Sequence, residues 1–237
     1  RSTLFPYTTL FRSTNRSILM VCLNDPDTCE PLAFMSGNLI SAMRTGAVPG
    51  VGAKYLARRN SKSVALIGGG PINKACLLAI CESVPSLEEI VLYDLIPEKA
   101  EAFLKEMGER LGKKTRVAKS EADALSDADI ISIAAAGSKA VSLKNEWLKP
   151  GSLLTLTGKA ELEGAYLQEC RIVADNWKMH QAYMQDAREL PDGVEAGYKN
   201  FISGDILRAL DEGKMDEKSI TKDRKSTRLN SSHTNRS

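Results

Sequence analysis

The chain has 237 residues, a formal net charge of +2, five cysteines and two histidines. It contains no run of about 18 apolar residues, so we expect no transmembrane helix, and no basic stripe indicates binding to nucleic acid. The cysteines are odd in number and form no CxxC pair, which argues against a metal site and is typical of reduced thiols in a cytoplasmic protein.

Both ends of the chain resemble translated sequencing adapters. Residues 1–13, RSTLFPYTTLFRS, and residues 223–233, DRKSTRLNSSH, each back-translate in a single frame to oligonucleotides that are ligated to DNA before sequencing. We therefore set 1–13 and 223–237 apart from the fold as adapter-like. Without these ends acidic residues slightly outnumber basic ones, so the mild basicity of the chain belongs to its ends.

Two apolar runs begin the remaining sequence and predict a β-hairpin. They are ILMVCLND, starting at residue 18, and PLAFMSG, starting at residue 31, with the turn-forming residues of 25–31 between them. A helix should follow from Asn38, a good N-cap. We expect Pro49 and the glycines around it to kink or break this helix before 53–59 resumes it.

From residue 63 onward the pattern alternates between strands and helices. The strands are unbroken apolar runs, as expected for strands buried on both faces of a parallel sheet. Residues 97–112 form an amphipathic helix with Pro97 in its first turn and Gly112 at its end. The pattern predicts an α/β fold with a doubly wound parallel sheet of the Rossmann type. Its strands are expected at 64–70, 89–94, 115–120, 128–135, 152–158 and 171–176.

The stretch VALIGGGPINKACLLAI, residues 64–80, has a glycine-rich turn between a strand and a helix. Gly68 suits the tight turn, and Gly70 lets the backbone approach a pyrophosphate whose charge the helix start attracts. Asn73 stands where a third glycine is usual, and it should push the helix away slightly without removing the anion site. Pro71 lacks one N–H donor. We predict cofactor contacts at Gly68, Gly70, Pro71, Ile72 and Asn73.

Asp94 ends the second strand of this pattern. A carboxylate at this place can accept hydrogen bonds from the ribose hydroxyls of the adenosine and would repel a 2′-phosphate, which favours NAD over NADP. The alternative is a carboxylate that only caps the helix over 97–103. Further along, Thr157 and Gly158 should lie near the nicotinamide half, while the small residues 134–138 either make room for the cofactor or merely pack.

The stretch 31–70 resembles the ornithine cyclodeaminase/mu-crystallin family. The match includes Ser-Ala-Met-Arg-Thr at 41–45 and Tyr-Leu-Ala-Arg at 55–58, and the sequence looks closest to the tyramine oxidase subgroup of this family. The resemblance implies that Arg44 binds a substrate carboxylate, which a guanidinium can grip through two hydrogen bonds. A surface ion pair is the alternative for Arg44. The resemblance also implies that 14–58 is a remnant of a substrate and dimerisation domain ahead of a C-terminally truncated Rossmann domain at 59–222.

One departure from the family concerns catalysis. Cyclodeaminases carry a catalytic Asp before a Pro-Gly-Lys-x-Glu-Leu segment, whereas TLTGKAEL at 155–162 lacks the insert that contains it. Asp175 and His180 follow the sixth strand and are candidates for proton transfer. An N-capping Asp and an exposed helical His are the alternatives.

Two functional hypotheses follow. The first is an NAD(H)-dependent enzyme acting at the C–N bond of an amino or imino acid, more readily a dehydrogenase or ketimine reductase than a cyclodeaminase. The second is a dinucleotide-binding protein without turnover, such as a ligand-binding protein or an accessory protein of an enzyme complex. The full-length protein is expected to be a cytoplasmic homodimer. We expect residues 14–222 alone to be unstable and monomeric.

Overall fold

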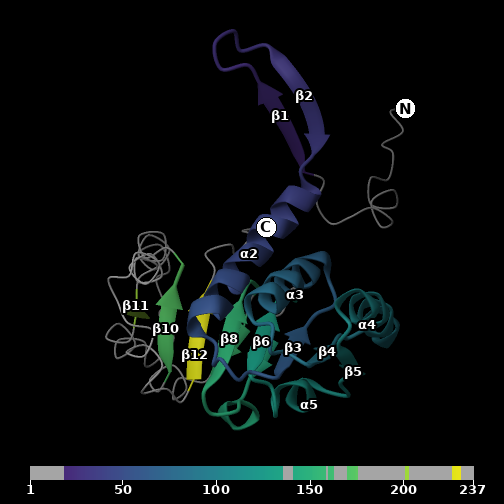
Figure 1. Ribbon diagram of the computed structural model, residues 1–237, viewed down its shortest axis with the longest axis vertical. Helices are drawn as coiled ribbons and strands as arrows, with labels where there is room; N and C mark the ends of the chain where they lie inside the picture. The colour runs from purple at the N-terminus through teal and green to yellow at the C-terminus, as the bar shows by residue number, and fades with distance from the viewer. Residues whose placement is uncertain are drawn as a thin grey trace, which may run out of the picture. The chain divides into compact units, whose positions relative to one another are not determined.

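The computed structural model describes residues 19–135, 141–158, 160–162, 170–175, 201–202 and 226–230 (Figure 1). The chain divides into two units between Arg44 and Thr45, and one helix runs through this division. The sequence placed the boundary between the substrate domain and the Rossmann domain at residues 58 and 59, which stays a prediction. Among the described residues, none of the helices is long and apolar enough to cross a membrane.

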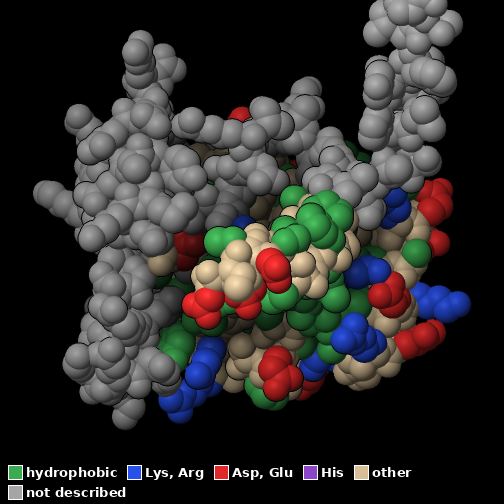
Figure 2. Space-filling view, turned by 90° about the horizontal axis from the view of Figure 1, so that it is seen from above, with side chains coloured by type: hydrophobic (Ala, Val, Ile, Leu, Met, Phe, Trp, Pro, Cys, Tyr) green, Lys and Arg blue, Asp and Glu red, His purple; other side chains and the backbone are tan. Residues whose placement is uncertain are grey.

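The smaller unit contains the predicted hairpin. Strands β1 (Met20–Asn24) and β2 (Pro31–Ser36) pair antiparallel, with an irregularity between Leu23 and Asn24. Asp25 closes the turn, since its Oδ1 accepts hydrogen bonds from the backbone N–H groups of Asp27 and Thr28 at 2.9 and 2.8 Å. Both strands expose large apolar side chains. Figure 2 looks down on the described part of the chain and shows hydrophobic side chains at its surface among acidic ones.

Helix α2 (Asn38–Leu56) is continuous through Pro49, so the expected break is wrong. Its C-terminal half packs closely against the helix that follows β3, α3 (Pro71–Ser83). A Cβ added to Gly46 would lie 2.4 Å from the backbone carbon of Ala75, and one on Gly50 would lie 2.6 Å from the Cβ of Ala79. This close packing holds α2 in one piece although proline removes a helical hydrogen bond.

The larger unit contains an 8-stranded sheet whose neighbouring strands all run parallel. The strand order is β11-β10-β12-β8-β6-β3-β4-β5 (Figure 1). Six of these strands confirm the predicted ones, and the fold is the predicted α/β Rossmann type. They are β3 (Ser63–Ile67), β4 (Glu89–Tyr93), β5 (Lys114–Val117), β6 (Ile130–Ile133), β8 (Ser152–Leu156) and β10 (Arg171–Ala174).

The sheet separates two apolar clusters. Val64 and Leu66 of β3 belong to the cluster shared with α2, α3 and α4 (Pro97–Leu111). Ala65 and Ile67 belong to the other cluster, with α5 (Glu121–Leu125) and the short 3₁₀ helix η1 (Asn145–Trp147). Alternate residues of one strand thus enter cores on opposite faces, which is the physical content of a doubly wound sheet. Gly112 ends α4 in the left-handed conformation with φ 61°, as its position predicted.

Four short strands were not predicted. β7 (Val141–Leu143) and β9 (Ala160–Leu162) form a separate parallel pair, while β11 (Phe201–Ile202) pairs with β10. β12 (Ser226–Asn230) lies between β8 and β10. It belongs to the segment 223–237 that was set apart from the fold, so the structure includes in the sheet a part of the chain that sequence reasoning left out.

Candidate functional site

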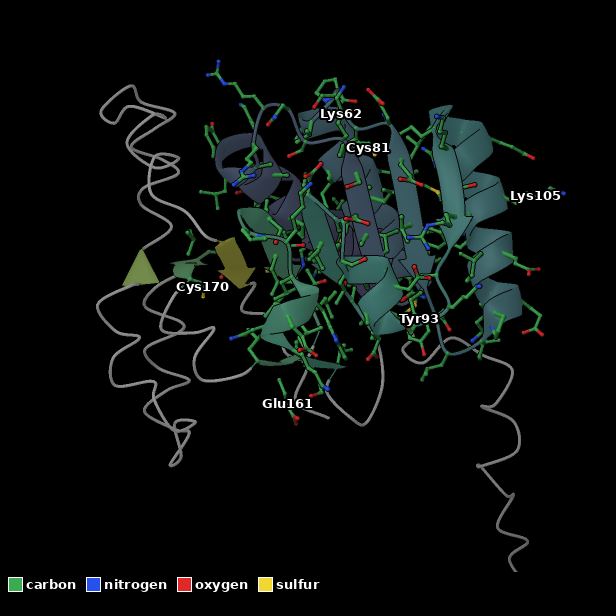
Figure 3. The ribbon with its side chains drawn as sticks, turned by 90° about the horizontal axis from the view of Figure 1, so that it is seen from below. Lys62, Cys81, Tyr93, Lys105, Glu161 and Cys170 are labelled. Carbon is green, nitrogen blue, oxygen red and sulfur yellow. The ribbon has the colours of Figure 1, made fainter. Side chains whose placement is uncertain are left out.

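The carboxyl ends of β3, β4, β6 and β8 lie at one edge of the sheet. In Figure 3, Tyr93, the last residue of β4, lies at this edge, opposite the edge marked by Lys62, which precedes β3. The chain order reverses at β3, because β4 pairs with one side of it and β6 with the other. Open parallel sheets bind ligands at such a point. The candidate site therefore comprises the residues that follow these four strands.

The turn from β3 into α3 is tight on its inner side. Gly68 has a φ of 96°, and a Cβ on it would lie 3.0 Å from the Cα of Ala135, so both conformation and space require glycine. The N–H of Gly68 donates to the carbonyl of Tyr93 at 2.8 Å. A Cβ on Gly70, in contrast, would meet nothing within 4 Å. The outer side of the turn is therefore open to a ligand.

The start of α3 suits an anion. Gly70 is the N-cap, no side chain caps the helix, and no acidic residue lies in its first turn. Pro71 has no N–H, so Ile72 carries the first amide of the helix, and such amides have no partner within a helix. These donors and the positive end of the helix dipole attract negative charge. Together with the open face of Gly70, this arrangement fits a pyrophosphate group.

Asp94 joins the glycine turn to the next helix. Its Oδ2 accepts a hydrogen bond from the N–H of Gly69 at 2.7 Å, and its Oδ1 accepts one from the N–H of Ile96, the N-cap of α4, at 2.9 Å. The two sequence interpretations of Asp94 are thus compatible, since the carboxylate stabilises the start of α4 and also lies against the turn. Each oxygen keeps a further lone pair for another donor.

Asn73 is wholly buried under the turn. Its Nδ2 donates to the carbonyls of Ile67 and Gly68 at 2.9 and 2.7 Å, and its Oδ1 accepts a hydrogen bond from the hydroxyl of Ser132 at 2.8 Å. The side chain therefore points into the protein and ties α3 to β3 and β6. Sequence reasoning missed Ser132, although a serine within the apolar run 128–135 is a signal of a buried polar contact.

A second pair of side chains continues this polar layer toward β8. The Sγ of Cys76 lies 3.9 Å from the Oγ1 of Thr157, and that hydroxyl donates to the carbonyl of Ile133 at 3.0 Å. Burial raises the pKa of the Cys76 thiol, which outweighs the opposing hydrogen bonds from Ser132 and Thr157. Cys76 therefore stays a neutral thiol at neutral pH and is unsuited to nucleophilic chemistry.

Small residues line the ends of β6 and β8. A Cβ on Gly158 would lie 3.1 Å from the backbone nitrogen of Ala135, which also lies against Gly68. Ala134 and Ala135 are half-buried, so they are packed between two turns and also reach the carboxyl edge of the sheet. The two alternatives for these small residues, packing and room for a ligand, are both compatible with this position.

The structure brings together Gly68, Gly70, Pro71, Ile72, Asn73 and Asp94. Arg44 lies exposed on α2, in the smaller unit. Asp175 is half-buried just after β10, and His180 lies outside the described residues. The assigned roles of these residues stay predictions.

The strand order 3-2-1-4-5, formed here by β5, β4, β3, β6 and β8, together with a glycine turn that opens onto an uncapped helix, defines a Rossmann-type domain. Residues 8–221 match the ornithine cyclodeaminase/mu-crystallin family, and the chain belongs to this family.

Individual relatives agree with this assignment. Delta(1)-pyrroline-2-carboxylate reductase of Bacillus cereus is 41% identical over 112 residues, which cover 47% of this chain and 34% of that protein. The Thermococcus litoralis Delta(1)-pyrroline-2-carboxylate reductase, solved with NADH and L-proline, has a TM-score of 0.65 and 30% identity over 90% of this chain and 66% of that one. An archaeal alanine dehydrogenase dimer with bound NAD has a TM-score of 0.70 and 25% identity over 94% of this chain and 68% of that one.

Proposed function

We propose that this chain belongs to an NAD(H)-dependent oxidoreductase that acts at the C–N bond of an amino or imino acid. The observation that carries the proposal is the β3–α3 turn, in which an open Gly70, an uncapped helix start and the carboxylate of Asp94 lie together. Support for the reaction class comes from the reductase solved with NADH and L-proline. The matched region covers only about a third of the Bacillus relative, so the activity of the whole protein is part of the proposal.

The residues of the turn would hold NAD(H) in a defined order. Gly70 and the amide of Ile72 would lie against the pyrophosphate, and the free lone pairs of Asp94 would accept hydrogen bonds from the adenosine ribose. Thr157 and Gly158 would lie toward the nicotinamide. The bound nicotinamide would supply or accept the hydride at the substrate carbon that bears nitrogen.

Arg44 would hold the substrate carboxylate through its guanidinium, which fits the planar geometry of that group. In the reducing direction the imine carbon gains a hydride and its nitrogen gains a proton, so the site needs a proton donor. Asp175 and His180 are the candidates, because both follow β10, whose carboxyl end lies at the edge of the sheet that binds ligands.

Calorimetric titration of the full-length protein with NAD and with NADP tests the cofactor. Turnover with a panel of cyclic imines and α-amino acids, followed by nicotinamide absorbance, tests the reaction. We expect saturable binding of NAD and turnover of at least one member of the panel. Absence of binding by either cofactor would contradict the proposal.

A non-catalytic dinucleotide-binding protein is the second candidate. The observation in its favour is the segment after β8, where the catalytic Asp of cyclodeaminases has no counterpart in 155–162. Binding of NAD without turnover of any amino or imino acid would favour it over the enzyme.

Finer assignments belong to the same proposal. Membership of the tyramine oxidase subgroup, a cytoplasmic location and the adapter origin of 1–13 and 223–237 rest on the sequence alone. A homodimer is supported by the archaeal alanine dehydrogenase, which was solved as a dimer. Sequencing of the complete gene tests the origin of both ends, since adapter-derived residues would be absent from it.

A further inference from the structure

Asn73 makes contacts that a glycine at its position could not make. The residue is completely buried, and a buried amide is stable only if its donors and acceptor are paired. Its amide bonds the last two carbonyls before the turn, those of Ile67 and Gly68. Asn73 thus holds the end of β3 from below.

The Gly68–Gly69 peptide is held from its two sides. Its carbonyl accepts the hydrogen bond from Asn73 Nδ2 at 2.7 Å, and its N–H donates to Asp94 Oδ2 at 2.7 Å. The carbonyl and N–H of a trans peptide point in opposite directions, so the two side chains approach one rigid plane from opposite sides. Rotation of this plane would break both bonds.

We propose that Asn73 is a positioning residue for the dinucleotide: with Asp94 it clamps the Gly68–Gly69 peptide, and so fixes both the shape of the turn and the direction of the Asp94 carboxylate. The inference rests on the proposed function, because it assigns Asn73 a role in NAD(H) binding. It also assigns the Gly69 N–H to Asp94, so the pyrophosphate would be bound by other amides, such as that of Ile72.

Ser132 fixes the orientation of the Asn73 side chain. Its hydroxyl donates to Asn73 Oδ1 at 2.8 Å, so the oxygen of the amide faces β6 and its NH₂ faces the two carbonyls. The reversed orientation would place an oxygen against two carbonyl oxygens. The clamp therefore requires an amide at residue 73 and gains its direction from β6, which lies 59 residues further along the chain.

Binding of NADH to four forms of the full-length protein tests the coupling: wild type, Asn73→Ala, Asp94→Ala and the double variant. We expect Asn73→Ala to weaken NADH binding about tenfold, since one buried hydrogen-bonded group is lost near the site. Because both side chains act on one peptide, the double variant should bind at least about threefold better than the product of the two single effects predicts.

Thr155→Val is the matched control. Thr155 is equally buried in the same sheet, and its hydroxyl donates to the carbonyl of Ile131 at 3.0 Å, away from the turn. All titrations are made below the unfolding temperature of every variant. We expect Thr155→Val to leave NADH affinity within about twofold of wild type and to combine with Asp94→Ala by simple multiplication.

Amide hydrogen exchange at Gly69, measured by NMR without cofactor, tests the clamp independently. Protection of this amide should fall in Asn73→Ala and stay unchanged in Thr155→Val. Unchanged protection in Asn73→Ala, or independent effects of Asn73 and Asp94 on NADH affinity, would overturn the clamp. Failure of the wild-type protein to bind NADH would instead contradict the proposed function and, with it, a role in cofactor binding, while exchange would still decide whether the clamp exists.

Discussion

Asp94 uses one carboxylate to hold the amides of Gly69 and Ile96. If the same group binds the adenosine ribose, its removal should weaken NAD binding at least about tenfold, because a charge-assisted hydrogen bond is lost. Binding of NADP should weaken less or improve, since the charge that repels a 2′-phosphate is gone. Titration of Asp94→Ala with both cofactors measures this. Asp123→Ala, which removes another hydrogen-bonded carboxylate at a strand–helix turn, should leave both affinities unchanged.

Gly68 and Gly112 provide a matched pair of glycines with positive φ, 96° and 61°. A Cβ on Gly112 would meet nothing within 4 Å, whereas one on Gly68 would press on the backbone of Ala135. We expect alanine at either position to lower the free energy of unfolding by about 1–2 kcal/mol through backbone strain. Only Gly68→Ala should also weaken NAD binding. Urea unfolding and calorimetry separate the two effects, and equal NAD affinity in both variants would contradict the role of the turn.

At the residue scale, the sequence was sufficient to predict Gly68, Gly70 and Asp94 as one cluster, because their spacing follows from a strand, a turn and a helix. The contacts of Asn73 could not be predicted in this way. Its partner Ser132 is distant in sequence, and only the pairing of β3 with β6 brings the two together. Burial of an asparagine in place of glycine is therefore a consequence of tertiary structure.

At the scale of elements, α2 and α3 meet through small residues. Gly46→Ala normally favours a helix by up to about 1 kcal/mol, but its Cβ would overlap the backbone of Ala75. We therefore expect this variant to lower the free energy of unfolding by about 1–3 kcal/mol. Val51→Ala, on an exposed position of the same helix, should change it by less than about 0.5 kcal/mol. A stabilised Gly46→Ala, measured by urea unfolding, would refute the close packing of the two helices.

Asp129 links three elements at the amino edge of the sheet. Its carboxylate accepts hydrogen bonds from Lys149 Nζ at 2.6 Å and from the Lys62 N–H at 2.7 Å. Partial burial raises the pKa of Asp129, but the hydrogen bonds from Lys149, Lys62 and Ser63 and the charge of Lys149 outweigh it and lower the pKa below its ordinary value of 3.8. The folded state thus binds this proton more weakly than the unfolded state does.

The stabilisation by Asp129 is therefore complete above pH 3.8 and is lost as pH falls through the lower folded value. Asp129→Asn should reduce the free energy of unfolding at neutral pH by about 1–3 kcal/mol and flatten its loss in acid. Urea unfolding across this pH range measures both. Asp127→Asn, an exposed neighbour, is the control. Because Asp129 lies at the edge opposite the site, NAD affinity should not change.

The elements themselves were largely predictable, and the exceptions have physical reasons. Strands β3, β4, β6 and β8 are apolar because both of their faces are buried, so their sequences alone mark them. β7 and β9 have three residues each, too few for a periodic pattern. α2 continues through Pro49 because packing against α3 outweighs a local signal, which sequence periodicity does not contain.

For the whole molecule, the two units differ in how they bury apolar surface. The larger unit places its strands between two apolar clusters. The hairpin of the smaller unit exposes large apolar side chains, namely Met20, Leu23, Leu32, Phe34 and Met35. A two-stranded hairpin is marginally stable by itself in water. A second copy of the chain, as in the proposed homodimer, is the partner we expect to cover these side chains.

Phe34 is the residue at which this expectation is best tested. Its side chain is 70% exposed on β2, so a substitution there does not disturb a core. We expect the full-length protein to sediment as a dimer and Phe34→Glu to shift it toward monomer at equal concentration, because a charge would be buried in an apolar interface. Val117→Glu, on the edge strand β5, should remain a dimer. A wild-type monomer at every concentration would refute the homodimer, and a dimeric Phe34→Glu would place the interface elsewhere.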